Sequence, residues 1–335
     1  MIVITESLRQ WLGLVGRVGP RLKEPPRRGR PYVYSATILL RCYLLMLIYP
    51  PARSWSGLHR LLMAHVLLRR MVGLSAVPHR TTFMRRFTAM EYALKQHIWA
   101  MGVAFVMAGY VELHVLIADG SLHQADGPSW PAKYKAQGLV PDKLRHVDQG
   151  AGWGKSPYHG WVWGYRSHPV VALNAALEPI PLLCDVRAAD VQDNNILRDQ
   201  LPWLPDSATA LLLDSGYEDE SLLQAWQQRD DDGVLQRWMI IDPKSRPGQP
   251  SDWRQQLQVW RSLEEEPLYR LRACRMEPFF AHWKAAFDLE RVPLQGIAAR
   301  CYLLLGLYAY QLLIWSNRLA QRPTYAYRHL FFGDS

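Results

Sequence analysis

The stretch His114–Ser121 reads HVLIADGS, and it decides which folds the rest of the chain can adopt. Four successive apolar residues, two of them β-branched, are typical of a strand buried inside a sheet. Asp119 follows where that strand should end, and Gly120 permits a sharp turn. The stretch therefore delivers one carboxylate to the rim of a rigid sheet. A lone aspartate in this place is more often a turn former, so its meaning depends on whether other carboxylates arrive there.

A second stretch, Ala210–Tyr217, repeats the pattern as ALLLDSGY, with an apolar strand that ends in Asp214. Further elements are predicted from hydrophobic periodicity and turn residues: strands at 161–173, 180–186 and 238–241, and helices at 190–201, 219–229 and 275–289. The last of these helices contains Glu277. This order of elements predicts an α/β, RNase H-like fold, in which a mixed sheet is flanked by helices.

Net charge is unevenly distributed along the 335 residues. The whole chain carries +9, whereas residues 1–100 alone carry about +13, so the remainder is slightly acidic. A basic first third joined to an acidic remainder favours a polyanion-binding module attached to a second unit. The alternative is a basic surface that is only solvated.

Within the basic third, Val77–Phe87 reads VPHRTTFMRRF. A proline followed by two threonines is a helix start, and Phe83 and Phe87 lie one turn apart on one face. With a preceding helix that stops at Gly73, this is the layout of a helix-turn-helix. Two packed core helices with solvated arginines are the alternative. We divide the chain into an all-α helix-turn-helix-containing domain, 1–105, and a catalytic domain, 106–335, with a small insertion at 242–268 and a C-terminal apolar helix.

Cysteine usage and hydropathy bear on the compartment. The four cysteines are far apart and form no CxxC pair, which fits a reducing environment. Two stretches, Ala36–Tyr49 and Ile297–Trp315, approach the hydrophobicity of a membrane span, but each holds an arginine. We predict that both are core helices, and we expect a cytoplasmic protein that does not use a membrane.

Neighbouring strand ends can bring Asp119 and Asp214 together, and a helix packed across the sheet can add Glu277. Clustered carboxylates repel one another unless a hard cation lies between them. Two Mg²⁺ ions about 4 Å apart can activate a water or hydroxyl and stabilise the leaving oxygen in phosphodiester cleavage.

Five blocks of the sequence, in this order, resemble the DDE transposases of bacterial and archaeal insertion sequences, particularly the groups related to insertion sequences four and five. The blocks are GLSAVPHRTTFMRRF (73–87), IADGSLHQA (117–125), WGYRSHPVVALNAALEPIPLLCDVRAADVQDN (163–194), LLLDSGYEDESLL (211–223) and RMEPFFAHWKAAFDL (275–289). The resemblance implies that Asp119, Asp214 and Glu277 are the catalytic, metal-binding triad. The expected cofactor is Mg²⁺, two ions in all, with Mn²⁺ able to substitute.

The same resemblance implies further site residues on the glutamate helix. Lys284 matches the family lysine, since six residues separate it from Glu277. The family arginine is less direct, because four residues lie between Arg272 and Glu277 where three are usual. The extra residue rotates Arg272 away from the Glu277 face of a helix, and Arg275 is the candidate to replace it in binding DNA. End recognition is expected from Arg80, Thr81, Thr82, Arg85 and Arg86.

The resemblance therefore predicts a DNA transposase that binds the terminal inverted repeats of its element and catalyses metal-dependent strand cleavage and strand transfer. Its partners would be double-stranded DNA, both repeats and target, and a second copy of the chain in a homodimer on DNA. Two alternatives stay open: a non-catalytic DNA-binding repressor or scaffold derived from a transposase, and an RNase H-like nuclease without strand transfer. Several tryptophans, among them Trp153, Trp161 and Trp163, could stack on distorted DNA ends, although core packing is the default for tryptophan.

Overall fold

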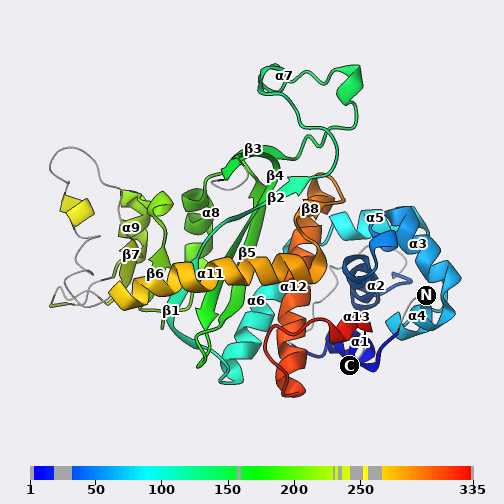
Figure 1. Ribbon diagram of the computed structural model, residues 1–335, viewed down its shortest axis with the longest axis horizontal. Helices are drawn as coiled ribbons and strands as arrows, with labels where there is room; N and C mark the ends of the chain where they lie inside the picture. Colours follow the sequence, from blue (N-terminus) through cyan, green and yellow to red (C-terminus); the bar gives the residue numbers. More distant parts are fainter. Residues whose placement is uncertain are drawn as a thin grey trace.

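The computed structural model describes residues 4–18, 32–156, 160–228, 231–232, 236–241, 252–255 and 266–332. Most of the insertion predicted at 242–268 lies outside these ranges. The described residues form a central sheet with helices packed around it, and a helical group at one end of the molecule (Figure 1).

Five strands make the body of the sheet, in the order β5-β4-β1-β6-β7. Their bounds are β1 Glu112–Ala118, β4 Gly160–Leu173, β5 Pro179–Ala188, β6 Ala210–Leu213 and β7 Trp238–Ile241. β1, β6 and β7 run parallel, whereas β4 is antiparallel to β1 and β5 is antiparallel to β4. This mixed sheet with flanking helices confirms the predicted α/β, RNase H-like fold class.

β4 is long enough to pair with four other strands. β2 (Ser121–Ala125) continues the ladder that β1 begins, because Ala118 pairs with Val170 and Ser121 pairs with Ser167 in one register. Asp119 and Gly120 therefore interrupt a single line of pairing. β3 (Gly152–Ser156) pairs with the start of β4, and β8 (Arg291–Val292) pairs with β2.

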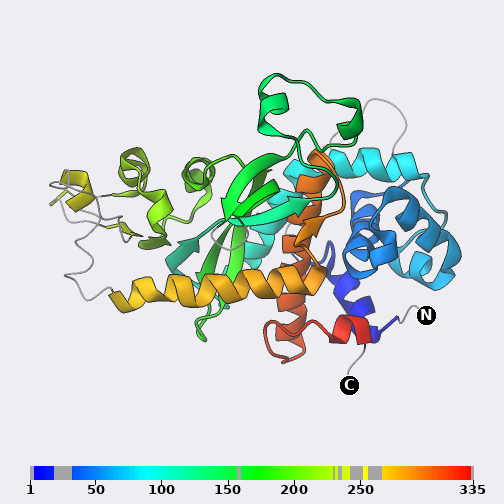
Figure 2. The ribbon, with the colours of Figure 1, turned by 45° about the horizontal axis from the view of Figure 1, so that its top comes forward.

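Helices cover the sheet, and β5 and β6 are accordingly buried over most of their length. The helices in contact with β5, β6 or β7 are α6 (Glu91–Met107), α8 (Asp193–Gln200), α9 (Glu220–Trp226), α11 (Glu266–Phe287) and α12 (Ile297–Leu319). α11 runs across the sheet in both ribbon views (Figures 1 and 2). It begins at Glu266, nine residues before the predicted start at Arg275. Met276, Phe279 and Trp283 form its buried face, and the residues before Arg275 extend the helix beyond that face.

The C-terminal apolar helix, α12, is a core element. By length and composition it could cross a membrane, but 89% of its most apolar window is buried inside the protein. It packs against α1, α2, α5 and α6, as well as the sheet. The prediction of a buried core helix from its arginine and its aromatics is confirmed.

The N-terminal third is helical, as predicted. Its elements are α1 Glu6–Leu14, α2 Ala36–Ile48, η1 Pro50–Ala52, α3 Trp55–Ala64, α4 Val66–Val72 and α5 Arg80–Thr88. α4 ends at Gly73 in the left-handed conformation, and α5 buries Phe83 and Phe87. A connection of seven residues, 73–79, joins the two helices, which is longer than the three or four residues usual in a helix-turn-helix.

A long excursion leaves the sheet after β2 and returns at β3, and it projects from the body in both ribbon views (Figures 1 and 2). It carries α7 (Ala132–Ala136) and η2 (Asp142–Leu144). Its composition, rich in glycine, proline, lysine and histidine, predicts an irregular segment from Ala125 to Gly160. The structure corrects this by placing β3 inside the segment, where it pairs with β4. The remaining elements are η3 Leu201–Trp203, η4 Ser215–Tyr217 and α13 His329–Phe332.

The contact of α6 with β5 predicts a large effect from a single methyl group. A Cβ added at Gly102 would lie 2.8 Å from the backbone oxygen of Leu182, closer than such atoms approach in proteins. Gly102→Ala should therefore lower the free energy of unfolding by about 1–3 kcal/mol through overpacking, measured by urea denaturation. The matched control is Gly13→Ala in α1, where nothing lies within 4 Å of the added atom. The control should be neutral, or stabilising by up to about 1 kcal/mol; equal effects at both sites would contradict the packing argument.

Candidate active site

The two predicted aspartates stand side by side because of strand register. Ile117 of β1 pairs with Leu212 of β6 in a parallel ladder, and each aspartate follows two residues later. Asp119 and Asp214 therefore leave the carboxyl ends of neighbouring strands at the same level. Each also fixes the turn behind it: Asp119 accepts a hydrogen bond from the Gly120 amide at 2.8 Å, and Asp214 accepts one from the Gly216 amide at 2.7 Å.

The surroundings of Asp119 disfavour its ionised form. Burial, helped by the negative charge of Asp214, raises the pKa of Asp119 to about 6. Arg272 opposes this rise, since its guanidinium donates to Asp119 Oδ2 at 3.1 Å. The ionised form of Asp119 is therefore less favourable here than in water, even with Arg272 beside it.

A second cation, Arg166, comes from β4. It donates to Asp193 and, at 3.3 Å, to the carbonyl of Ala189, and its charge also acts on Asp119. Burial lowers the pKa of Arg166, while Asp119 and Asp214 raise it. Two arginines therefore lie against the acidic pair, from strand β4 and from helix α11.

Asp193, the first residue of α8, is a third carboxylate close to Asp119. A side chain at residue 120 would overlap the carboxylate of Asp193, so only glycine permits this approach. One carboxylate oxygen, Oδ1, is buried and has no hydrogen-bond partner. From sequence alone, an aspartate at the start of a helix is interpreted as a cap or a solvated residue; the structure places this one against the turn that follows Asp119.

Glu277 is not gathered into this cluster. Arg272 faces Asp119, and five residues later the helix has turned by about 140°. Met276, four residues after Arg272, takes the inward position and is 1% exposed, whereas Glu277 is exposed. Among the described residues, no group of three or more aspartate, glutamate, histidine or cysteine side chains is arranged to hold a metal ion.

The other two site residues predicted on α11 lie near different parts of the chain. Lys284 donates to the carbonyl of Leu122 at 2.9 Å and pairs with Glu290 at 2.7 Å, so it reaches the strand that follows Asp119. Arg275 is half-buried next to Tyr325, and it is Arg272 that contacts Asp119. The sequence spacing left the choice between these arginines open.

A buried hydrogen-bonded chain supports the second aspartate. His168 Nδ1 lies 2.7 Å from Gln200 Oε1, an acceptor, so Nδ1 carries the proton and Nε2 accepts from the Tyr217 hydroxyl at 2.6 Å. Burial lowers the pKa of His168 to about 4, which keeps the ring neutral. Tyr217 is 1% exposed and feels the charges of both aspartates. These hydrogen bonds attach the turn after Asp214 to β4, through His168, and to α8, through Gln200.

The residues predicted to recognise DNA lie on α5, away from the sheet. Arg80, Thr81 and Arg85 are exposed. Thr82 and Arg86 are half-buried, and Arg86 donates to the carbonyl of Tyr34 at 3.3 Å and stacks on the ring of Tyr32 at 3.8 Å. Arg86 thus also holds the segment before α2.

Sequence reasoning missed Arg166 and Asp193 as members of the site. A signal for Arg166 was present, since it is the single formal charge in the apolar run 161–173. Asp193 carried no such signal, because an aspartate at the first turn of a helix is an ordinary capping or dipole residue.

The chemistry of the donors suits a hard divalent cation. Carboxylate oxygens are the ligands that Mg²⁺ prefers, and a cation between Asp119 and Asp214 would relieve the repulsion that raises the pKa of Asp119. By their chemistry and their shared position at the sheet rim, these two residues fit a metal ion.

The sheet order and the paired strand-end aspartates define the protein as an RNase H-like α/β protein with an acidic site at the sheet rim. A family model described as the transposase DDE domain matches residues 112–312, which is more than half of the chain. The chain therefore belongs to the DDE transposases of insertion-sequence type. No curated protein matches the sequence significantly.

The raised pKa predicts that removing one charge stabilises the metal-free protein. The pKa of Asp119 is about 6 when folded and 3.8 in a model peptide, so ionisation costs stability as pH rises from about 4 to about 6. The Asp119→Asn side chain cannot ionise, so the variant does not lose this stability. Above pH 6 its free energy of unfolding should exceed that of wild type by at most about 3 kcal/mol. Urea denaturation in EDTA at low and neutral pH measures the difference.

Asp142→Asn, at an exposed aspartate in the excursion, is the matched control and should leave stability unchanged. A variant Asp119→Asn that is less stable than wild type at neutral pH would show that the Arg272 contact outweighs the repulsion.

Proposed function

We propose that this protein binds the terminal inverted repeats of an insertion sequence, cuts DNA there in a metal-dependent reaction and joins the freed end to target DNA. The observation that carries the proposal is the register of β1 and β6, which sets Asp119 beside Asp214 at the sheet rim. Membership of the DDE transposases supports it.

Asp119, Asp214 and Glu277 are proposed as catalytic residues and as ligands of two Mg²⁺ ions, with Mn²⁺ as a substitute. Bound divalent ions would activate the attacking water or 3′ hydroxyl and stabilise the leaving oxygen. Asp119 and Asp214 are already adjacent, and Glu277 lies on the helix that places Arg272 against Asp119. The assignment of Glu277 rests on its sequence block, because its side chain is exposed in this structure.

The basic residues around this site are proposed to hold the DNA backbone. Lys284 lies near the strand that leaves Asp119, and Arg275 lies on the same helix. We propose that both bind phosphates near the cut. Phosphate contacts position a nucleic acid and carry little sequence information.

End recognition is proposed for α5, with Arg80, Thr81, Thr82, Arg85 and Arg86 as its contact residues. Arg80 and Thr81, in the first turn of α5, and Arg85, in its last turn, are exposed and carry hydrogen-bond donors. Because two element ends must be cut together, we propose a homodimer on double-stranded DNA, acting in the cytoplasm at the nucleoid.

Two rival functions predict different products. A repressor derived from a transposase would bind the repeats without cutting, and a nuclease of the same fold would cut without joining. Incubation of the protein with its flanking repeats, a target duplex and Mg²⁺ separates the three, since only a transposase yields joined products.

The acidic pair predicts the first result of that assay. Asp119→Ala and Asp214→Ala should each lower the rate of cleavage by at least about 10³-fold. Each variant lacks a proposed ligand of the metal ions that would stabilise charge in the transition state. Product formation on labelled repeat DNA measures this. Repeat binding should persist in both variants, which distinguishes lost chemistry from lost folding. Cleavage at the wild-type rate by either variant would refute the assigned site.

The third ligand has a matched comparison within the chain. Glu277→Gln should lower cleavage by about 10²-fold or more, whereas Asp193→Asn should have a smaller effect, since it alters the partner of Arg166. If Asp193→Asn lowered cleavage more than Glu277→Gln, Asp193 and not Glu277 would be the third metal ligand.

The α5 surface predicts a salt-dependent contribution to DNA binding. Arg80→Ala and Arg85→Ala should each weaken binding to the repeats and reduce the slope of log K against log salt by about 1. The control is Arg9→Ala, an exposed arginine on α1 paired with Glu6. Fluorescence anisotropy over a salt series makes the comparison. An equal loss in the control would show that α5 is not a distinct DNA surface.

A further inference from the structure

The two aspartates of the acidic site differ in which of their oxygens are free. Asp214 Oδ1 accepts from the Gly216 amide, and among the described residues Asp214 Oδ2 has no hydrogen-bond partner. Asp119 has a donor on each oxygen, the Gly120 amide on Oδ1 and the Arg272 guanidinium on Oδ2. A cation that bridges the two carboxylates would therefore find an open oxygen on Asp214 and an occupied one on Asp119.

Of the two donors on Asp119, Arg272 is the one that can be exchanged. The Gly120 amide belongs to the residue directly after Asp119, and the turn holds it at 2.8 Å from Oδ1. Arg272 comes from another element, α11, and its Nη1 lies 3.1 Å from Oδ2. Mg²⁺ binds carboxylate oxygens at about 2.0–2.1 Å, so an ion on Oδ2 would lie next to the guanidinium. Because like charges repel at this range, a metal ion and Arg272 compete for the same oxygen.

Arg272 has fewer attachments than the other arginine of the site. Arg166 donates to two acceptors outside the acidic pair, Asp193 and the carbonyl of Ala189. Within the described part of the chain, Asp119 is the one acceptor of the Arg272 guanidinium, whose side chain is partly exposed. Arg272 can therefore leave by breaking one hydrogen bond, whereas Arg166 is anchored to α8 and to the segment before it.

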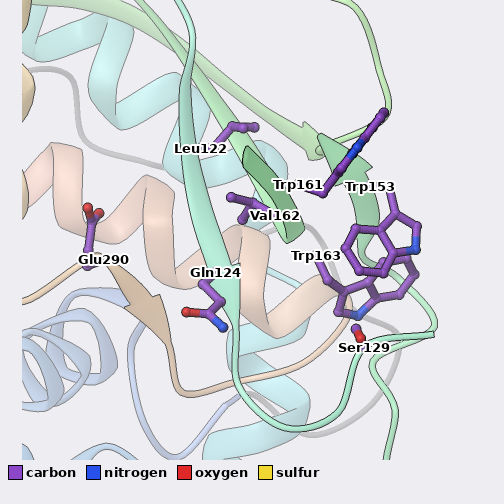
Figure 3. Close-up of a pocket in the computed structure, with 8 residues that line it drawn as sticks. All are labelled: Leu122, Gln124, Ser129, Trp153, Trp161, Val162, Trp163 and Glu290. Atoms are coloured by element: carbon purple, nitrogen blue, oxygen red, sulfur yellow. The ribbon is translucent and has the colours of Figure 1, made fainter. Parts of the chain in front are cut away.

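The remainder of α11 is held by contacts of its own. Twelve residues after Arg272, about 18 Å further along a helix, Lys284 donates to the Leu122 carbonyl and pairs with Glu290. Leu122 and Glu290 line a pocket of about 320 Å³. The other side of this pocket carries three tryptophans (Figure 3), Trp153, Trp161 and Trp163. A change at Arg272 leaves these contacts intact, so its release from Asp119 is local to one side chain.

We propose that Arg272 is the resident counter-ion of the acidic site: it occupies the Asp119 oxygen that a divalent cation needs, and the cation must displace it to bind. The contact thereby lowers the affinity of the site for metal and sets the metal concentration at which the site fills. The inference rests on the proposed function, which places a divalent ion at Asp119. It adds that the metal-free and metal-bound proteins differ at Arg272.

Binding of Mn²⁺ to the full chain, without DNA, tests the proposal. Mn²⁺ suits carboxylate ligands, and its free concentration is followed by electron paramagnetic resonance during a titration at neutral pH. Arg272→Gln should bind Mn²⁺ at least about tenfold more tightly than wild type, because the competing charge is gone. Arg272→Lys keeps the charge as a single ammonium and should gain less.

Two further variants show where the gain arises. Arg275→Gln is the matched control, since it removes the same charge from the same helix at a side chain that lies next to Tyr325. It should change the dissociation constant of Mn²⁺ by less than about twofold, because charges outside direct contact are screened. The double variant Arg272→Gln, Asp119→Asn should lose the gain, because the uncovered oxygen no longer belongs to a carboxylate.

The proposal is overturned if Arg272→Gln binds Mn²⁺ no more tightly than wild type, if Arg275→Gln gains as much, or if the gain persists in the double variant. Arg272→Met keeps the aliphatic stem of the arginine and repeats the test should urea denaturation show that Arg272→Gln is unfolded. The result is independent of cleavage. A protein that cuts and joins DNA without the gain keeps the proposed function and loses this inference, whereas one that shows the gain but cuts no DNA does the reverse.

Discussion

Register in the parallel ladder between β1 and β6 is the constraint on which the site depends. A slip of one residue in this pairing would turn one of the two strand-end aspartates toward the opposite face of the sheet. In the observed register, Asp119 and Asp214 meet at one level. Burial, together with the negative charge of Asp214, raises the pKa of Asp119 to about 6, and Arg272 opposes the rise. The turn glycines, the two arginines and the buried His168–Tyr217 pair all serve to keep these carboxylates in place.

Helix α11 shows how packing and chemistry compete for the faces of one element. Met276, Phe279 and Trp283 bury one face against the sheet and α12, and Arg272 follows that face to Asp119. Glu277, one residue further than the family spacing, is turned toward solvent. One added residue rotates a helical side chain by about 100°, which is enough to exchange an inward glutamate for an inward methionine.

The region that follows Asp119 joins the acidic site to an aromatic surface. β2 carries the chain from the aspartate to the pocket, and Lys284 fixes the same strand from α11. The excursion between β2 and β3 was expected to be irregular, yet its end forms the hairpin that holds Trp153 against Trp163. A short stretch of sheet therefore connects the groups proposed for chemistry with a cluster of tryptophans.

The sequence was enough to predict the five strands of the sheet body, their order along the chain and the two aspartates at strand ends, because an apolar run followed by an aspartate and a turn is a local pattern. β6 and β7 occur at the predicted residues, and α12 is the buried helix that its composition indicated. Which charges surround those aspartates depends on the tertiary structure. Arg272 contacts Asp119 from α11, Arg166 acts on it through its charge from β4, and Asp193 of α8 lies against the Gly120 turn. The orientation of α11 depends on packing against residues far away in the chain. The tryptophan pocket is likewise a product of pairing between β3 and β4, since alternate side chains share a face only once the register is set.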